Sequence, residues 1–201
     1  MNIVLIGMAG SGKGTQAKKI AEKYGLKHIS TGDVLRAEVA TGSDLGKKIK
    51  DFQDKGELVP TSIVVEALKK YLADNNIFDG FPRNLEQAKA LDEFVKIDLV
   101  IYLKIPDEVA VDRLSKRRQC ESCGFITDSS HSRCPVCGGR LFQRSDDTPE
   151  AIKKRLALFH DVTEPLLEYY KPRDIVHVVD GVRSVDEIFH EICAIVDESF
   201  V

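Results

Sequence analysis

A glycine-rich stretch near the N-terminus has the residue types and the spacing that bind phosphate. Residues 7–15, Gly-Met-Ala-Gly-Ser-Gly-Lys-Gly-Thr, follow an apolar run at 3–6 and precede a stretch of helical period. Glycines let backbone N–H groups and a helix N-terminus point at phosphate oxygens, and Lys13 adds a mobile cation. Thr15 supplies a hydroxyl for magnesium, although the residue directly after the lysine is Gly14. The pattern predicts binding of ATP or GTP.

Four of the five cysteines form two pairs with the spacing of metal ligands. Two residues separate Cys120 from Cys123 and Cys134 from Cys137, and ten residues lie between the pairs. A two-residue gap lets two thiolates reach one ion, and four sulfurs make a closed tetrahedral site that suits structural zinc. Disulfides and an iron–sulfur cluster are the alternatives, and a reducing compartment favours metal. Cys193 stands alone among apolar residues of helical period, and we expect it to pack in the core.

Apolar runs typical of buried strands alternate along the chain with segments of helical period. The runs lie near residues 3–6, 28–30, 77–78, 99–103 and 175–179. This alternation predicts an α/β fold, a five-stranded parallel sheet with helices on both faces. Ligands of such sheets bind at the carboxyl ends of the strands. The unusual residues collect there, namely Gly7 onward, Thr31 to Asp33, Asp79 to Arg83, and Asp180-Gly181.

Two segments depart from this alternation and are expected to project from the core. Residues 31–60 are polar and punctuated by glycines, and residues 116–147 hold the four paired cysteines. Thr148-Pro149 then predicts a helix start, since threonine suits the cap and proline the first position. An earlier helix is expected to begin at Pro106-Asp107 and to carry Arg113 and Arg117 on one face, because they are four residues apart.

Composition sets the broad class. The 201 residues are 43% apolar and 30% charged, with a formal net charge of −3. No run approaches the eighteen or so apolar residues that a membrane span needs, so we expect a soluble protein without a membrane partner. The start of the sequence has no signal-peptide pattern, which makes the cytoplasm the expected location. The near-neutral charge argues against a nucleic-acid partner.

Taken together, the motifs resemble those of the adenylate kinase family of nucleoside monophosphate kinases, of the type with a zinc-containing lid. The resemblance rests on Gly12 to Gln16, Ser30 to Arg36, Asp79 to Arg83, and Arg113 with Arg117, in this order. It implies a P-loop kinase fold with a core of residues 1–29, 60–115 and 148–201, a segment for the monophosphate at 30–59, and a lid at 116–147. It also implies a monomer that uses Mg²⁺ and transfers phosphoryl reversibly from ATP to AMP, giving two ADP.

The same resemblance implies roles for single residues. ATP is expected to contact Gly10, Ser11, Gly12, Lys13, Gly14, Thr15, Arg117, Ile126, Thr127 and Arg183. AMP is expected to contact Thr31, Arg36, Glu57, Leu58, Val59, Gly80, Phe81, Pro82, Arg83, Gln87, Arg144 and Arg155. The catalytic cations would be Lys13, Arg83, Arg113, Arg117, Arg144 and Arg155. Such a site needs fixed cations and must exclude water. Asp79 would orient water on magnesium, and Asp146 with Asp147 would position the lid.

Two other functions stay open at the level of the sequence. Asn84 follows the Phe-Pro-Arg motif as in some pyrimidine enzymes, so a UMP/CMP kinase of the same fold is the first alternative. Thr31 and Gln87 favour adenine instead, since its exocyclic amine needs a matching acceptor. The second alternative is a zinc ribbon that binds nucleic acid through basic residues around the cysteines. That alternative does not account for the arginines outside the ribbon.

Overall fold

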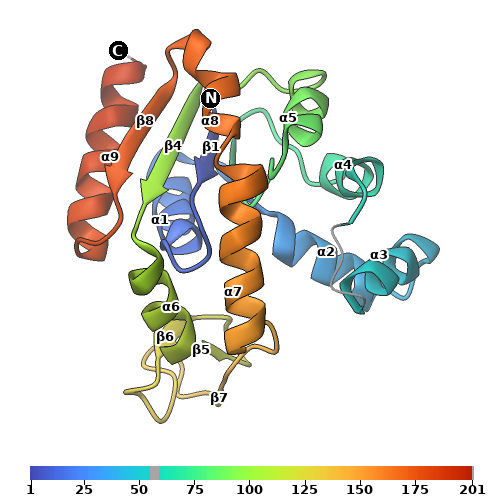
Figure 1. The fold of residues 1–201 in the computed structure, drawn as a ribbon, viewed down its shortest axis with the longest axis vertical. Helices are drawn as coiled ribbons and strands as arrows, with labels where there is room; N and C mark the ends of the chain where they lie inside the picture. Colours follow the sequence, from blue (N-terminus) through green and yellow to red (C-terminus); the bar gives the residue numbers. More distant parts are fainter. Residues whose placement is uncertain (55–58, 201) are drawn as a thin grey trace.

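A five-stranded parallel sheet forms the centre of the molecule (Figure 1). In this computed structural model, which describes residues 1–54 and 59–200, the strand order is β2-β3-β1-β4-β8. The strands are β1 (Asn2–Ile6), β2 (Lys27–Ser30), β3 (Asn76–Asp79), β4 (Leu99–Lys104) and β8 (Val176–Asp180). All of the strand pairings in this sheet are parallel. The predicted fold class is therefore confirmed, and the strands lie where the apolar runs placed them.

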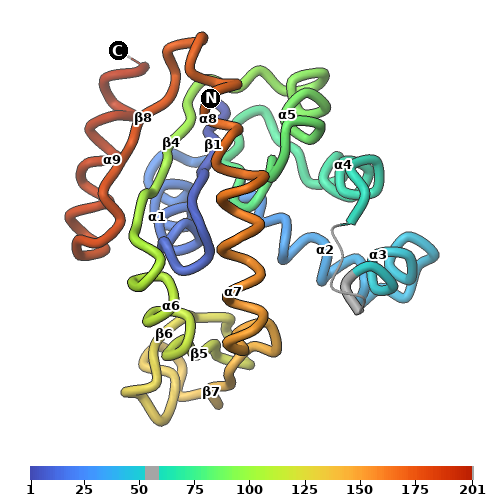
Figure 2. Tube along the Cα trace, viewed as in Figure 1, coloured from blue at the N-terminus to red at the C-terminus, as the bar shows by residue number. Residues whose placement is uncertain are grey.

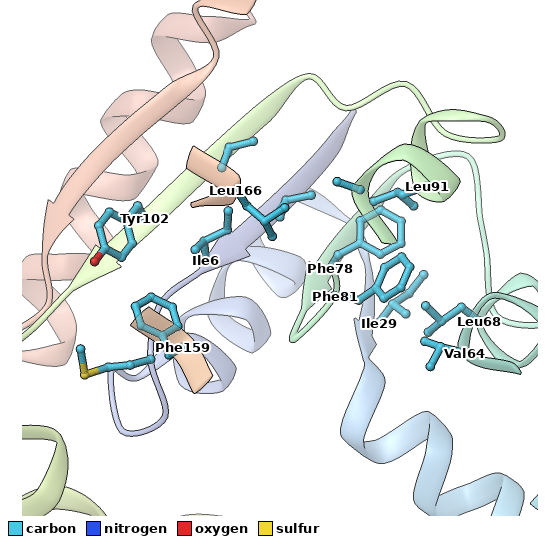
Figure 3. Packing of buried hydrophobic residues seen from close by; sticks show 14 of the residues in the cluster. Ile6, Ile29, Val64, Leu68, Phe78, Phe81, Leu91, Tyr102, Phe159 and Leu166 are labelled. Atoms are coloured by element: carbon cyan, nitrogen blue, oxygen red, sulfur yellow. The ribbon is translucent and has the colours of Figure 1, made fainter. Parts of the chain in front are cut away.

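Alternate residues of each strand are buried on opposite faces of the sheet. Along β1, Ile3 and Leu5 join one apolar cluster and Val4 and Ile6 the other, as the alternation of a strand requires. The first cluster packs under α1 (Lys13–Tyr24) and α9 (Val185–Ser199). The second is larger and extends to helices on the opposite face, with Phe78 near its centre (Figure 3).

A group of short helices projects from one side of the sheet. They are α2 (Thr31–Ala40), α3 (Asp44–Asp54) and α4 (Thr61–Lys69), and α5 (Leu85–Asp92) lies beside them on the sheet (Figure 1). Glu38 of α2 is buried and accepts from Lys70 Nζ at 3.1 Å and from Ser43 Oγ at 3.0 Å. A Cβ at Gly46 would lie 2.3 Å from the Glu38 carbonyl oxygen. The absence of a side chain there lets α3 pack directly on α2.

A second projection leaves the core between two helices and forms its own small sheet. Helices α6 (Asp107–Lys116) and α7 (Pro149–Leu158) flank the antiparallel strands β5 (Arg117–Cys120), β6 (Ile126–Asp128) and β7 (Leu141–Phe142). Figure 2 shows this segment at the opposite end of the molecule from the chain termini. Thr148 caps α7 by accepting from Ala151 N, as the sequence predicted.

One prediction about α6 was wrong. The helix ends at Lys116, and Arg117 has extended backbone, with φ −58° and ψ 136°, at the start of β5. Arg113 and Arg117 therefore do not share a helical face. A four-residue spacing brings two side chains together only where the helix continues.

The chain returns from the lid through an irregular helical region. After α7 it forms a π-helical turn η1 (Phe159–Thr163), the short α8 (Leu166–Tyr170) and the 3-10 turn η2 (Lys171–Arg173). Ile152, Leu156 and Phe159 of this stretch are buried against the sheet. Among the residues that the structure describes, no helix is both long and apolar enough to cross a membrane.

Substitution of two neighbouring valines of β8 tests which face of the sheet each one occupies. Val179 is fully buried under α9, whereas Val178 is 58% exposed on the other face. Val179→Ala should lower the free energy of unfolding by about 2 kcal/mol, because it removes buried methyl groups and leaves a cavity. Val178→Ala should cost less than about 0.5 kcal/mol. Urea denaturation measures both, and equal losses would contradict the register of this strand.

Candidate active site

The phosphate loop joins the end of β1 to the start of α1. Gly10 and Gly12 have φ angles of 85° and 93°, in the left-handed region that favours glycine. A Cβ at Gly10 would also lie 3.1 Å from the Ala110 carbonyl oxygen of α6. Ser11 is buried between the two glycines. The loop therefore has the tight backbone that the sequence predicted, and α1 directs its N-terminus into it.

Lys13 lies at the centre of a cluster of charges. Its Nζ donates to the carbonyl oxygens of Gly7 at 2.5 Å and Met8 at 2.9 Å. Burial lowers the pKa of Lys13 to about 8, and the charges of Arg83, Arg155 and Arg117 act in the same direction, while Asp79 opposes them. Three other segments of the chain thus bring an arginine within electrostatic reach of Lys13.

Asp79 ends β3 directly beside the phosphate loop. A Cβ at Gly14 would lie 3.1 Å from Asp79 Oδ2, so the missing side chain after Lys13 makes room for this carboxylate. Burial would raise the pKa of Asp79, but neighbouring His28 and then Lys13 outweigh it and lower that pKa. The carboxylate is therefore ionised at neutral pH.

His28 is a site residue that sequence reasoning missed. Its Nε2 lies 3.8 Å from Asp79 Oδ2, within ion-pair range but beyond hydrogen-bond length. This nitrogen atom is buried and has no hydrogen-bond partner. A histidine in the middle of a short strand gives no signal of this, because the contact depends on the register of β2 against β3, in which Ser30 pairs with Asp79.

Arg83 follows the strand end in a loop with defined geometry. Its Nε donates to the Gly80 carbonyl oxygen at 2.8 Å, and its backbone N–H donates to Gln87 Oε1 at 2.8 Å. Gly80 has a φ of 80°, and the Phe81-Pro82 peptide bond is cis. Phe81 and Pro82 are buried under the loop. These contacts hold Arg83 at the carboxyl edge of the sheet, within electrostatic reach of Lys13.

The residues expected around a monophosphate have different surroundings. Thr31, the first residue of α2, is buried, and its hydroxyl has no hydrogen-bond partner. Arg36 lies within electrostatic reach of Arg83 and donates to Asp33 Oδ1 at 2.5 Å. Val59 is buried in the core cluster. The predictions for Glu57 and Leu58 fall outside the described residues.

Asn84 has a local role in this structure. Its side-chain oxygen accepts from the Gln87 backbone N–H at 2.8 Å and so caps the N-terminus of α5. Asparagine is among the best residues for this position. The residue that suggested a pyrimidine enzyme is therefore explained by helix capping.

Two carboxylates at the base of the lid hold three of the predicted arginines. Arg117 makes a bidentate pair with Asp147, at 2.8 and 2.6 Å, and the Asp147 side chain is fully buried. Arg144 makes a bidentate pair with Asp146, at 2.9 and 3.1 Å. Arg155 of α7 contacts both carboxylates, at 3.1 and 3.3 Å. The predicted role of Asp146 and Asp147 in positioning the lid is consistent with this network.

Arg113 has a different set of partners. Its guanidinium donates to the carbonyl oxygens of Gly10, Gly181 and Val182, at 3.3, 2.9 and 3.2 Å. It therefore ties the phosphate loop to the turn after β8. Beside this turn lies a cavity of about 720 Å³, lined in part by Ile105 and Arg183.

Three further residues expected to contact ATP are Arg183, Thr127 and Ile126, and no contact with the phosphate loop is recorded for their side chains. Arg183 pairs with Glu191 of α9 and donates to the Asp180 carbonyl oxygen. Thr127 contacts His131 within the lid, 3.0 Å from Nδ1. Ile126 is 40% exposed on β6. The structure thus gives Arg183 and Thr127 side-chain partners outside the phosphate loop, and leaves Ile126 exposed.

The four paired cysteines come together at the tip of the lid. Their sulfurs all lie within 4.8 Å of one another, and Cys120 and Cys137 are 3.5 Å apart. Four thiolates around one zinc ion, each about 2.3 Å from it, would be about 3.8 Å apart. All five cysteines of the chain are unbridged. The cluster fits one tetrahedral metal ion.

The backbone around the sulfurs is built for this close approach. Gly124 and Gly138 have φ angles of 69° and 71°, and their N–H groups donate to the carbonyl oxygens of Cys120 and Cys134. The two turns thus have the same geometry. Within residues 117–145, all of which the structure describes, the only buried hydrophobic residues are Cys120 and Cys134. The lid therefore lacks an apolar core of its own.

Comparison with known proteins gives the family. The family model described as adenylate kinase matches residues 5–175. The chain belongs to the adenylate kinase family. An adenylate kinase of Thermodesulfovibrio yellowstonii is 46% identical over 98% of this chain and 100% of its own length. Those of Methanosarcina barkeri and Archaeoglobus fulgidus are 44% and 43% identical, over 97% and 98% of this chain and 98% and 99% of their own lengths.

The lowered pKa of Lys13 predicts that ATP binding takes up a proton at alkaline pH. Because this pKa is about 8 in the free protein, Lys13 is mostly neutral at pH 9. Bound phosphates stabilise the charged amine and raise its pKa, so the complex holds more protons than the free protein. ATP affinity should therefore fall as the pH rises above about 8, by up to about tenfold per unit.

Calorimetric titration with ATP at pH 9, in two buffers of different ionisation enthalpy, measures this uptake. Lys13→Met is the control and should show no uptake. A wild-type protein that binds ATP at pH 9 without taking up a proton would contradict the assignment.

Proposed function

We propose that this chain catalyses the reversible, Mg²⁺-dependent transfer of a phosphoryl group from ATP to AMP, giving two molecules of ADP. The observation that carries the proposal is that two elements with cations suited to phosphate, the phosphate loop and the loop after β3, meet at one edge of the sheet. Lys13 of the phosphate loop lies within electrostatic reach of Arg83, which follows a different strand, and of Arg117 and Arg155 at the base of the lid. One nucleotide would need only the first element, whereas transfer between two needs both.

We assign the ATP side of the site to the phosphate loop. The backbone of Gly10, Ser11, Gly12 and Gly14 would bind the phosphates together with Lys13, and Thr15 would lie near the magnesium ion. Asp79 would orient water on that ion, since magnesium keeps several of its waters. The cavity lined by Ile105 and Arg183 supports an adenine position beside Gly181. Ile126 and Thr127 would contact ATP only after a movement of the lid.

We assign the AMP side to α2, the loop after β3 and the start of α5. Arg83 would bind the α-phosphate, with Arg36 near it, and Gly80, Phe81 and Pro82 would shape the loop. The buried hydroxyl of Thr31 has no protein partner, which supports a ligand contact there. Gln87 Oε1 already accepts from Arg83 N, but an amide oxygen has a second lone pair for the adenine amine. Glu57, Leu58 and Val59 would frame the base.

Catalysis then follows from alignment and charge. Lys13, Arg113, Arg117, Arg144 and Arg155 would surround the transferring phosphoryl group, whose oxygens carry the developing charge. Closure of residues 30–59 and of the lid, residues 116–147, over a core of residues 1–29, 60–115 and 148–201 would exclude water. The phosphates would compete with Asp146 and Asp147 for the arginines. The chain would act as a monomer in the cytoplasm.

The assay that tests the reaction measures ADP formed from ATP and AMP in the presence of magnesium. AMP should be turned over faster than UMP, CMP or GMP, and Lys13→Ala should lower kcat/KM at least about a hundredfold, because it removes a cation from the transferring phosphate. Lys18→Ala, on the exposed side of the same helix, is the matched control and should leave activity within about twofold. If UMP were turned over faster than AMP, the protein would be a UMP kinase and not an adenylate kinase. Tight RNA binding without phosphotransfer would contradict the kinase function altogether.

We further propose that Cys120, Cys123, Cys134 and Cys137 bind a structural zinc ion. Four sulfurs leave no open position for water, so the metal would stabilise the lid and take no part in the reaction. Because the lid has no apolar core, the metal would supply much of the free energy that folds it.

Metal analysis tests this zinc assignment directly. The purified protein should contain about one zinc ion per chain. Cys134→Ser should lose the metal and speed hydrogen exchange in residues 117–142, while Cys193→Ser, in α9, should retain it. Iron in place of zinc, or slow exchange in the metal-free lid, would contradict the proposal.

A further inference from the structure

The π-helical turn η1 changes the course of the chain where it leaves the lid. Glu164 N donates to the Phe159 carbonyl oxygen at 2.8 Å, five residues back, in place of the α-helical partner. Such a turn inserts one residue into the helical repeat and shifts the direction of the side chains that follow. Thr163 is the last residue of this turn. The direction in which it projects is therefore set by the π geometry.

Thr163 makes one contact that reaches far along the sequence. Its hydroxyl donates to the backbone carbonyl oxygen of Arg83 at 2.8 Å. The other two recorded bonds of Arg83 are local in sequence, from its N–H to Gln87 of α5 and from its side chain to Gly80. Both partners lie within four residues of Arg83 in the sequence. The Thr163 hydroxyl is thus the recorded contact that joins Arg83 to a segment distant in the sequence.

The turn that presents Thr163 is itself held in place by a chain of polar contacts. His160 lies between two carboxylates, with Nε2 2.9 Å from Asp107 Oδ1 and Nδ1 2.8 Å from Glu164 Oε2. Tyr102 of β4 donates to the other oxygen of Glu164 at 2.7 Å, and the ring of Phe159 stacks on that of Tyr102. Figure 3 shows these two rings side by side above the sheet. The position of η1 is therefore set by the central sheet and by the start of α6.

We propose that Thr163 is a positioning residue for the binding of the monophosphate substrate, a role that rests on the proposed function. Its hydroxyl holds the backbone of Arg83 so that the guanidinium stays aligned with the α-phosphate of AMP. The donor belongs to η1, which follows α7 where the chain leaves the lid. The contact therefore links that segment to the loop after β3. Thr163 itself touches neither nucleotide. Its loss lowers affinity for AMP and leaves affinity for ATP unchanged.

Paired variants separate this role from a structural one. Thr163→Val keeps the shape of the side chain and removes the donor, whereas Thr163→Ser keeps the hydroxyl. We expect Thr163→Val to raise KM for AMP about three- to tenfold, the range that one lost hydrogen bond gives, with KM for ATP and kcat within about twofold. Thr163→Ser should restore KM for AMP. Equal effects of the two variants, or a parallel change in both KM values, would overturn the proposal.

A double-mutant cycle provides a second measurement that does not depend on turnover. The dissociation constant of AMP is measured by calorimetry for wild type, Thr163→Val, Arg83→Gln and the double variant. If Thr163 acts through Arg83, Thr163→Val should weaken AMP binding in the wild-type background and have no effect on top of Arg83→Gln. Additive effects would overturn the proposal. A wild-type protein that neither binds nor turns over AMP would refute the proposed function and this inference with it, whereas an active wild type with unchanged Thr163→Val refutes the inference alone.

Discussion

The constraint on which the rest of the structure depends is the crowding of positive charge at the carboxyl edge of the central sheet. Lys13 and Arg83 come from loops that follow two different strands, and Arg117 and Arg155 reach them from the base of the lid. Cations at such distances repel one another, and each loses hydration when the site is enclosed. Loss of hydration on burial, and then the charges of the three arginines, lower the pKa of Lys13 to about 8.

Carboxylates around the site partly neutralise this positive charge when no nucleotide is bound. Asp79 lies beside the phosphate loop, and Asp147 is buried against Arg117. Bidentate pairs fix both the position and the orientation of a guanidinium. The guanidinium of Arg117 is therefore held in one orientation within electrostatic reach of Lys13. This arrangement explains why acidic residues are part of a site for anions.

The fold supplies the geometry that brings these groups together. The adjacent parallel strands β1 and β3 end at the same edge of the sheet. The loops that follow them therefore meet there, whatever the local sequence of each loop. The helices α6 and α7 carry the lid and set the start and end of its small sheet. That sheet has little apolar surface to bury, and the four cysteine sulfurs gather within 4.8 Å of one another at its tip.

Much of this could be predicted from the sequence, and what could not has clear physical reasons. The strands and the helix start at Thr148 follow from local periodicity and capping, and the phosphate loop and the cysteine pairs are defined by short spacings. The contact of His28 with Asp79 depends on strand register. Arg117 was placed on α6 because nothing local marks the end of that helix. The π-helical turn and its link to Arg83 join residues 80 positions apart, which periodicity cannot show.

The most direct test of this account compares the stability of the ligand-free protein with that of Lys13→Met at pH 7. If burial and crowding make the charged amine unfavourable, its removal should leave the free energy of unfolding unchanged or raise it by about 1–3 kcal/mol, although the variant loses function. Urea denaturation without nucleotide gives this value. A variant less stable than wild type by more than about 1 kcal/mol would show that Lys13 is held by favourable interactions, and would contradict the view that this site stores charge for its substrates.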